Sequence, residues 1–262
     1  MRYAPLLLLP TLLLASCHGQ NTPTVTTYTS TSGTVRELGT PGANDMVAPT
    51  TAWTGGAGTI QATVADAGTQ GATSASLASN GTFTLPLPTN VKTRSLSSDE
   101  FTLPGSEELG CAGTPTVSDP AARFAVLDVN VSAGKQGPVN PVRISFTGTV
   151  NAPTGLSIES GAFLYADRPV SITGTQTCTL TESGETYTLT SSLNMTLGQG
   201  WNKVTATEII NDSGASLNLT SGTFPTEEWV YLDGSALTSA AVHRAASKLP
   251  AGLKPFKFSD LR

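Results

Sequence analysis

The residues with the most distinctive chemistry in this chain of 262 are its three cysteines, Cys17, Cys111 and Cys178. A cysteine sulfur can be acylated, can join a second cysteine in a disulfide, or can bind a metal. A zinc site made of Cys111, Cys178 and His243 would lack an obvious fourth ligand and would compete with a disulfide. We therefore expect covalent chemistry at the cysteines, and neither a metal site nor another cofactor.

The first cysteine follows a short apolar segment at the start of the chain. A single cation, Arg2, precedes an apolar run over residues 6–14, which is long enough for an export signal and too short for a permanent membrane-spanning helix. Small residues then lead to the cysteine in the sequence Leu14-Ala15-Ser16-Cys17. This stretch resembles the lipobox of bacterial lipoproteins.

The resemblance implies a processing step and a location. In lipoproteins the cysteine sulfur is lipidated, the signal is removed before the cysteine, and the new amino group is acylated. Cys17 would then be the first residue of a protein anchored in the bacterial cell envelope. His18 is not the aspartate that favours retention at the inner membrane, so we expect the outer membrane. The alternative is an ordinary export signal cut elsewhere, with Cys17 incidental.

The other two cysteines are the only thiols that remain in an exported chain once Cys17 is lipidated. An oxidising envelope favours a Cys111–Cys178 disulfide, which would close a loop of about 67 residues. The chain-entropy model gives such a loop roughly 4 kcal/mol of stabilisation. Two separate buried thiols remain the alternative, because the sequence does not show that the two Cα atoms approach each other.

No set of residues predicts catalysis. His18 adjoins the expected lipid anchor, and His243 is the only other histidine, without a G-x-S-x-G motif to supply a nucleophile. Glu227 and Glu228 could be the paired carboxylates of a glycosidase, but adjacent strand residues point to opposite faces of a sheet. We therefore expect a protein that is not an enzyme.

The aromatic residues Trp201, Trp229 and Tyr231 allow a different use. They lie on late expected strands and could form a surface on which sugar rings stack, which would make the protein a ligand-binding lipoprotein. Aromatic residues on strands more often fill the core. We favour the core, and keep the stacking surface as the alternative function.

The composition predicts an all-β protein. Charged residues make up 13% and aromatic residues 6% of the chain, whereas Thr, Ser, Gly and Pro are abundant. β-Branched threonine suits strands, and glycine and proline suit turns. Short alternating apolar runs separated by turns predict an antiparallel β-sandwich or partly open barrel, with a flexible N-terminal tether and one short C-terminal helix.

The alternation is clearest in two regions. Ile60, Ala62 and Val64 alternate with polar residues, and Asn80-Gly81 predicts a turn before Phe83, Leu85 and Leu87. The region 53–91, with its NGTF strand ending in LPLP, resembles transthyretin-like and carboxypeptidase-regulatory-like β-sandwich modules, which act as stabilising or binding additions. Strands also recur from residue 123 onward.

These patterns divide the chain into six expected segments. They are a signal peptide (1–16), the lipidated cysteine with a disordered Thr/Ser/Gly/Pro-rich tether (17–52), a small β unit (53–91), a connector (92–122), the main β domain (123–234), and a short helix with a basic tail (235–262). The tether is expected because a segment with few large apolar residues cannot offset the entropy lost on ordering.

Charge is unevenly distributed along the chain. Residues 18–235 contain 8 Lys/Arg and 18 Asp/Glu, whereas residues 236–262 contain 5 Lys/Arg and 1 Asp. The acidic body argues against nucleic acid as a partner. The basic tail is expected to be a solvated terminus, and its alternatives are docking on the acidic body or contact with anionic lipid headgroups.

The sequence as a whole predicts a membrane-anchored envelope lipoprotein with a non-catalytic role in structure or protein contact. Its expected partners are the membrane, through the lipid anchor, and envelope proteins or polysaccharide.

Overall fold

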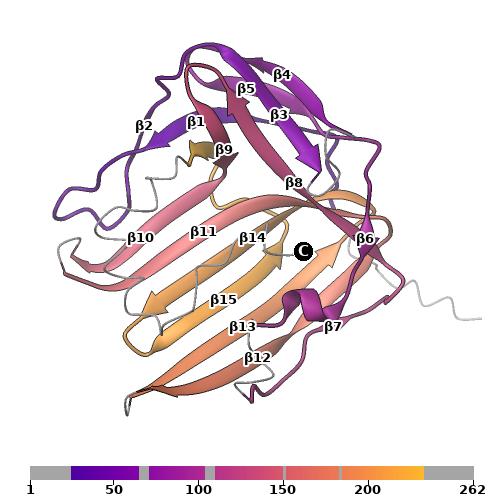
Figure 1. Cartoon of the computed structure of the whole chain (residues 1–262), viewed down its shortest axis with the longest axis vertical. Helices are drawn as coiled ribbons and strands as arrows, with labels where there is room; N and C mark the ends of the chain where they lie inside the picture. The colour runs from indigo at the N-terminus through magenta and orange to yellow at the C-terminus, as the bar shows by residue number, and fades with distance from the viewer. Residues whose placement is uncertain (1–24, 65–70, 104–109, 150–151, 183–184, 233–262) are drawn as a thin grey trace, which may run out of the picture.

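The computed structural model describes residues 25–64, 71–103, 110–149, 152–182 and 185–232, and nearly all of its regular structure is strand (Figure 1). The N-terminal half contains β1 (Ser30–Leu38), β2 (Thr50–Ala52), β3 (Gly58–Val64), β4 (Thr73–Leu77), β5 (Thr82–Pro86), β6 (Arg94–Ser95), the single-turn 3₁₀ helix η1 (Ser98–Phe101), β7 (Thr116–Val117) and β8 (Arg123–Ser132). The other strands are β9 (Gln136–Asn140), β10 (Val142–Thr149), β11 (Ala152–Ala166), β12 (Val170–Glu182), β13 (Glu185–Leu197), β14 (Gly200–Asn211), β15 (Gly214–Ser221) and β16 (Glu228–Tyr231).

The strands join in one large mixed sheet that does not close on itself. Its main order is β2-β1-β16-β9-β8-β11-β14-β15-β13-β12-β7, with β10 paired to β11, β5 to β1, and β3 to both β4 and β8. The all-β fold class predicted from the sequence is confirmed. Most pairs are antiparallel as expected, but β1 pairs with β16, and β13 with β15, in parallel.

Six long strands, β10 to β15, form the broad sheet in the lower half of Figure 1. Apolar and polar side chains alternate along them, so one side is buried and the other carries polar residues. On β13, for example, Leu193, Met195 and Leu197 are buried whereas Asn194 is exposed. We call the buried side the inner face and the opposite side the outer face.

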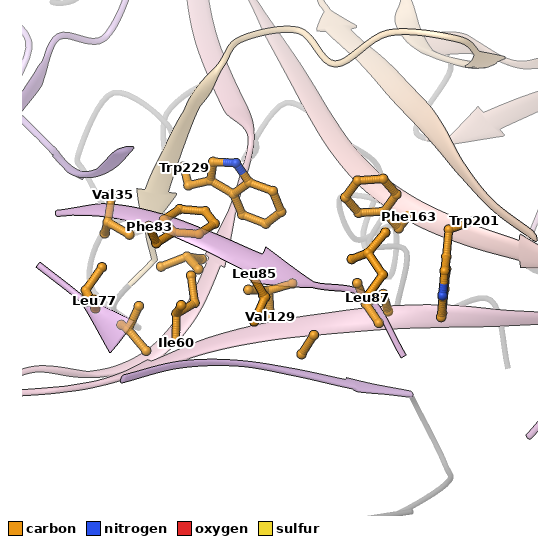
Figure 2. Packing of buried hydrophobic residues seen from close by; sticks show 14 of the residues in the cluster. Val35, Ile60, Leu77, Phe83, Leu85, Leu87, Val129, Phe163, Trp201 and Trp229 are labelled. Atoms are coloured by element: carbon orange, nitrogen blue, oxygen red, sulfur yellow. The ribbon is translucent and has the colours of Figure 1, made fainter. Parts of the chain in front are cut away.

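Most of the remaining strands arch over one end of this sheet and enclose the largest core (Figure 1). β1, β3, β4, β5, β8, β9 and β16 supply most of its side chains, and β11 and β14 add Phe163 and Trp201 (Figure 2). The strand β8 connects the two regions, because it pairs with β3 along one part and with β11 along another. Two smaller clusters lie on the inner face, one around Phe124 and Met195 and the other around Ile144 and Ile210.

The prediction of a disordered tether over residues 17–52 is wrong for the described part, residues 25–52. The strand β1 lies inside the sheet between β5 and β16, and Val35 is completely buried. The segment has little apolar surface of its own, but its partners supply the rest of the core. At Gly33 the indole of Trp229 packs so closely that a Cβ atom would lie 2.5 Å from Trp229 Cδ1.

The region 53–91 forms the expected strands but shares its core with the rest of the protein. Phe83, Leu85 and Leu87 are all buried, and the Asn80-Gly81 turn joins β4 to β5. However, β3 pairs with β8 and β5 pairs with β1, so the strands pair outside the region 53–91. The expected connector, 92–122, contains β6, η1 and β7.

Several predictions lie outside the described residues. They are the signal peptide, the lipid site at Cys17, and the C-terminal helix with its basic tail. Within the described ranges, no helix is long and apolar enough to cross a bilayer.

Candidate functional site on the outer face of the large sheet

The structure joins Cys111 and Cys178 in the disulfide expected from the sequence. Cys178 lies on β12, and the segment containing Cys111 runs antiparallel beside it. Ala112 and Thr177 exchange both backbone hydrogen bonds, at 2.8 Å each, so Cys111 and Cys178 occupy the neighbouring non-hydrogen-bonded position. Their Cα atoms are 4.1 Å apart. The bond fastens the chain beyond η1 to β12, the last long strand on this side of the sheet.

The three aromatic residues considered for sugar stacking do not form an exposed surface. Trp201 and Trp229 are 3% and 2% exposed and belong to the largest core (Figure 2). The indole nitrogen of Trp201 donates to the carbonyl of Pro88 at 2.8 Å, and the Trp229 ring meets Phe83 edge-on at 5.5 Å between centroids. Trp201 and Trp229 therefore fill the core, as favoured from the sequence, and the alternative stacking surface is not formed by them.

Tyr231 is half-buried and also has a structural place. Its ring packs edge-on against Trp53 at 5.6 Å between centroids, and its hydroxyl donates to the carbonyl of Gln136 at 2.9 Å. These contacts tie β16 to the segment before β3 and to β9. Tyr231 therefore has its ring and its hydroxyl both engaged within the protein.

The two adjacent glutamates at the start of β16 have different surroundings. Glu227 is exposed, whereas Glu228 accepts from Arg36 Nε at 3.1 Å and from the hydroxyl of Thr50 at 2.7 Å. The Thr50 hydroxyl and then Arg36 outweigh the effect of partial burial and lower the pKa of Glu228. Glu228 therefore holds β1 and β2 against β16, which is a structural task.

A second carboxylate, Glu37 on β1, is held in a similar way. Burial would raise the pKa of Glu37, but the Lys135 ammonium at 2.6 Å and the two donors of Thr54 at 2.8 Å outweigh it, so the pKa is lowered. A lowered pKa means that folding favours the carboxylate form. Both ion pairs thus contribute stability above the usual pKa of glutamate, and this contribution is lost as the pH falls through the lowered values.

The described residues contain no group of three or more His, Cys, Asp or Glu side chains that could hold a metal ion. In the acidic region before Cys111, Asp99 is exposed at η1 and Glu100 lies 3.6 Å from Arg94. Neither the described part of this acidic region nor the ion pairs of Arg36 and Glu37 on β1 bring functional groups together as a catalytic site would.

The remaining candidate for a functional surface is the outer face of β10 to β15. Residues paired directly opposite one another on neighbouring strands form a register row across the sheet. One such row runs from the segment beside β10 to the segment beside β12. In order, the row contains Val47, Ser145, Ser157, Ile209, Ser216, Thr190, Thr177 and Ala112. All eight side chains are uncharged.

The neighbouring rows continue the pattern. On β12 the outer positions are Thr173, Thr175, Thr177 and Thr179, and on β13 they are Thr188, Thr190, Ser192 and Asn194. The charged side chains described on the outer face of these strands are Arg143 with Glu159, 3.9 Å apart, and Lys203 under Phe224. The outer face therefore has little uncompensated charge on a body that is otherwise acidic.

The outer face also contains two of the three large apolar side chains that are exposed among the described residues. Val47 and Ile209 are 40% and 39% exposed, and Met46, beside Val47, is 52% exposed. Two serines separate Val47 from Ile209 in the central row. This combination makes the outer face the best candidate for contact with a partner.

No protein-family model, curated protein or solved structure matches the chain.

A Thr/Ser/Asn face that is regular and nearly uncharged can contact a partner with a small desolvation cost, because no isolated charge has to be stripped of water. The sequence contains a signal for this face, the alternation of threonine with buried residues along 173–179. That alternation alone predicts only a strand, because threonine favours strands whatever their use.

Proposed function

We propose that this chain is a lipid-anchored protein of the bacterial cell envelope, with a non-catalytic role in which the outer face of β10 to β15 contacts another envelope protein. Cys17 is the proposed anchor, and its support is the lipobox-like sequence Leu14-Ala15-Ser16-Cys17. The outer membrane is the proposed location, because His18 stands where aspartate would favour the inner membrane.

The observation that carries the contact role is the low charge of the outer face. The cores of protein interfaces are depleted in charged residues. Six strands about 4.8 Å apart, with four rows about 6.7 Å apart, give the outer face roughly 500 Å² between its outermost residues. A standard interface buries about 800 Å² on each partner, so the outer face suits one contact of less than standard size.

A protein partner fits the outer face better than polysaccharide does. Protein sites for sugars commonly use exposed aromatic rings, and the tryptophans Trp53, Trp201 and Trp229 are all buried. Val47 and Ile209 would instead bury apolar area against a protein, while the hydroxyls between them exchange hydrogen bonds.

Adding positive charge to the outer face should break the contact. Thr175→Lys, Thr190→Lys and Ser216→Lys place three ammonium groups in adjacent strands, and each would lose water without a matched partner. We expect the fraction of the protein that co-sediments in a membrane complex, after mild detergent extraction, to fall at least about tenfold, since 1.4 kcal/mol suffices for that change.

The control adds the same charge elsewhere. Gln61, Ser74 and Thr82 are exposed on β3, β4 and β5, and lysine at these three positions should leave the complex intact. Equal thermal unfolding temperatures would show that both triple variants fold. A protein that sediments alone before substitution, or equal losses in both variants, would contradict the proposed contact.

A further inference from the structure

The inner face has a feature that neither the anchor nor the outer face explains. One register row crosses four strands and contains three polar side chains, Gln176 on β12, Ser191 on β13 and Glu208 on β14, with Leu217 of β15 between the last two. They are 5%, 1% and 9% exposed. The rows on either side are mostly apolar, with Leu189 and Ile210 in one and Leu193 and Leu219 in the other.

Described residues approach this row from its two ends. The backbone N–H of Leu103 donates to Gln176 Oε1 at 2.7 Å, and at the other end Val230 and Leu232 join the cluster that contains Ile210. Between these ends, β15 packs mainly against β13 and β14, the two strands to which it is hydrogen-bonded. No other described strand packs extensively on it, and neither does the described 3₁₀ helix. The centre of the row is nonetheless buried, which requires a cover.

The charge of the row indicates the kind of cover. A carboxylate as buried as Glu208 needs a cation or several hydrogen-bond donors, and Glu208 is engaged by a partner in the folded chain. Most cations of the body are occupied elsewhere. The contacts are Arg36 with Glu228, Lys135 with Glu37, Arg143 with Glu159, Arg94 with Glu100, Arg168 with Asp167 and Asp119, Arg123 with Thr93, and Lys203 with the rings of Tyr28 and Phe224.

We propose that the C-terminal segment, residues 233–262, docks on the inner face and places one of its cations beside Glu208. This segment contains five of the six Lys and Arg residues that lie outside the body: Arg244, Lys248, Lys254, Lys257 and Arg262. It also contains apolar residues that suit the neighbouring rows, namely Leu249, Leu253, Phe256, Phe258 and Leu261. With five cations against Asp233 and Asp260, its net charge of +3 complements the acidic body.

The point at which the described chain ends fits this docking. Leu232 donates its backbone N–H to the carbonyl of Pro138 and packs against the apolar cluster that includes Ile210, a member of the row adjacent to Glu208. Thirty further residues could extend to roughly 100 Å, whereas crossing four strands takes about 15 Å. The segment is therefore long enough to cover the inner face with a full second layer.

Photo-crosslinking in the intact mature lipoprotein tests this proposal. Leu217, half-buried on the inner face, is replaced by p-benzoylphenylalanine, and the control places the same residue at Ile209, on the outer face of the neighbouring strand. We expect irradiation at position 217 to join peptides from residues 233–262, and position 209 to give no such product. Crosslinks from 217 to a second copy, to an acyl chain or to residues before 233 would overturn the proposal.

Charge reversal gives an independent measurement. Glu208→Lys should repel the basic segment, and trypsin should then cleave after Arg244 and Lys248 at least about tenfold faster than in the unsubstituted protein. Glu159→Lys makes the same change on the outer face and should leave cleavage unchanged. Equal cleavage in the unsubstituted protein and the Glu208→Lys variant, with intrinsic fluorescence showing both folded, would also overturn the proposal.

Discussion

Replacement of Val35 by aspartate is expected to abolish cooperative folding. Val35 is completely buried between β5 and β16, pairs with Trp229, and donates its backbone N–H to the carbonyl of Gly81 at 2.8 Å. An unpaired carboxylate at this point costs several kcal/mol, against a total stability of about 5–15 kcal/mol for an ordinary domain. Urea unfolding followed by tryptophan fluorescence should show no cooperative transition, or one shifted to much lower urea.

The control for this prediction lies on the same strand. Ser32→Asp adds the same charge at an exposed position of β1 and should change the free energy of unfolding by less than about 0.5 kcal/mol. If Val35→Asp unfolds at the same urea concentration as the unsubstituted protein, residues 30–38 do not belong to the sheet. The disordered tether expected from composition would then be right.

Removing the Cys111–Cys178 disulfide is expected to have the next largest effect. Its sequence separation of 67 residues corresponds to about 4 kcal/mol of loop-closure entropy. For a protein of this size, each kcal/mol changes the unfolding temperature by about 2–4 °C. The double variant Cys111→Ser, Cys178→Ser should therefore unfold roughly 8–16 °C lower in a calorimetric scan.

A reducing agent provides the matched control. It should lower the unfolding temperature of the unsubstituted protein by a similar amount and leave that of the double-serine variant unchanged. An unsubstituted protein that is insensitive to reduction, with two free thiols by mass spectrometry, would contradict the disulfide and restore the alternative of separate buried thiols.

The sequence predicted those parts of the fold that depend on local alternation. Phe83, Leu85 and Leu87, and likewise Val142, Ile144 and Phe146, occupy alternate positions, and all six are buried, five of them on strands and Leu87 just after β5. This pattern is a direct consequence of side chains pointing to opposite faces of a strand. Neither a partner strand nor a register is needed to detect it.

The parts that the sequence did not predict depend on partners distant in the chain. β1 contributes few large side chains, and it is ordered because Phe83 lies nearly fifty residues and Trp229 nearly two hundred residues away in sequence and both pack around it. The parallel pairing of β13 with β15 also joins strands that do not follow each other in the chain. β14 lies between them in sequence, whereas in the sheet β15 lies between β14 and β13.

The candidate site was missed for a related reason. Trp201 and Trp229 lie in the favoured core position because segments distant in the chain cover them, and the sequence alone does not show that cover. The threonines of 173–179 became a surface only when paired strands extended the same polar row from Thr177 through Thr190 to Ser216. A single strand shows which residues share a face, but not whether a second layer covers that face.

Metabolic labelling with a palmitate analogue tests the envelope anchor, on which the proposed function depends. We predict that the protein is labelled, that Cys17→Ser removes the label and releases the protein from the membrane fraction, and that the Cys111→Ser, Cys178→Ser variant keeps the label. An unlabelled protein, or a label that persists in Cys17→Ser, would contradict the proposal.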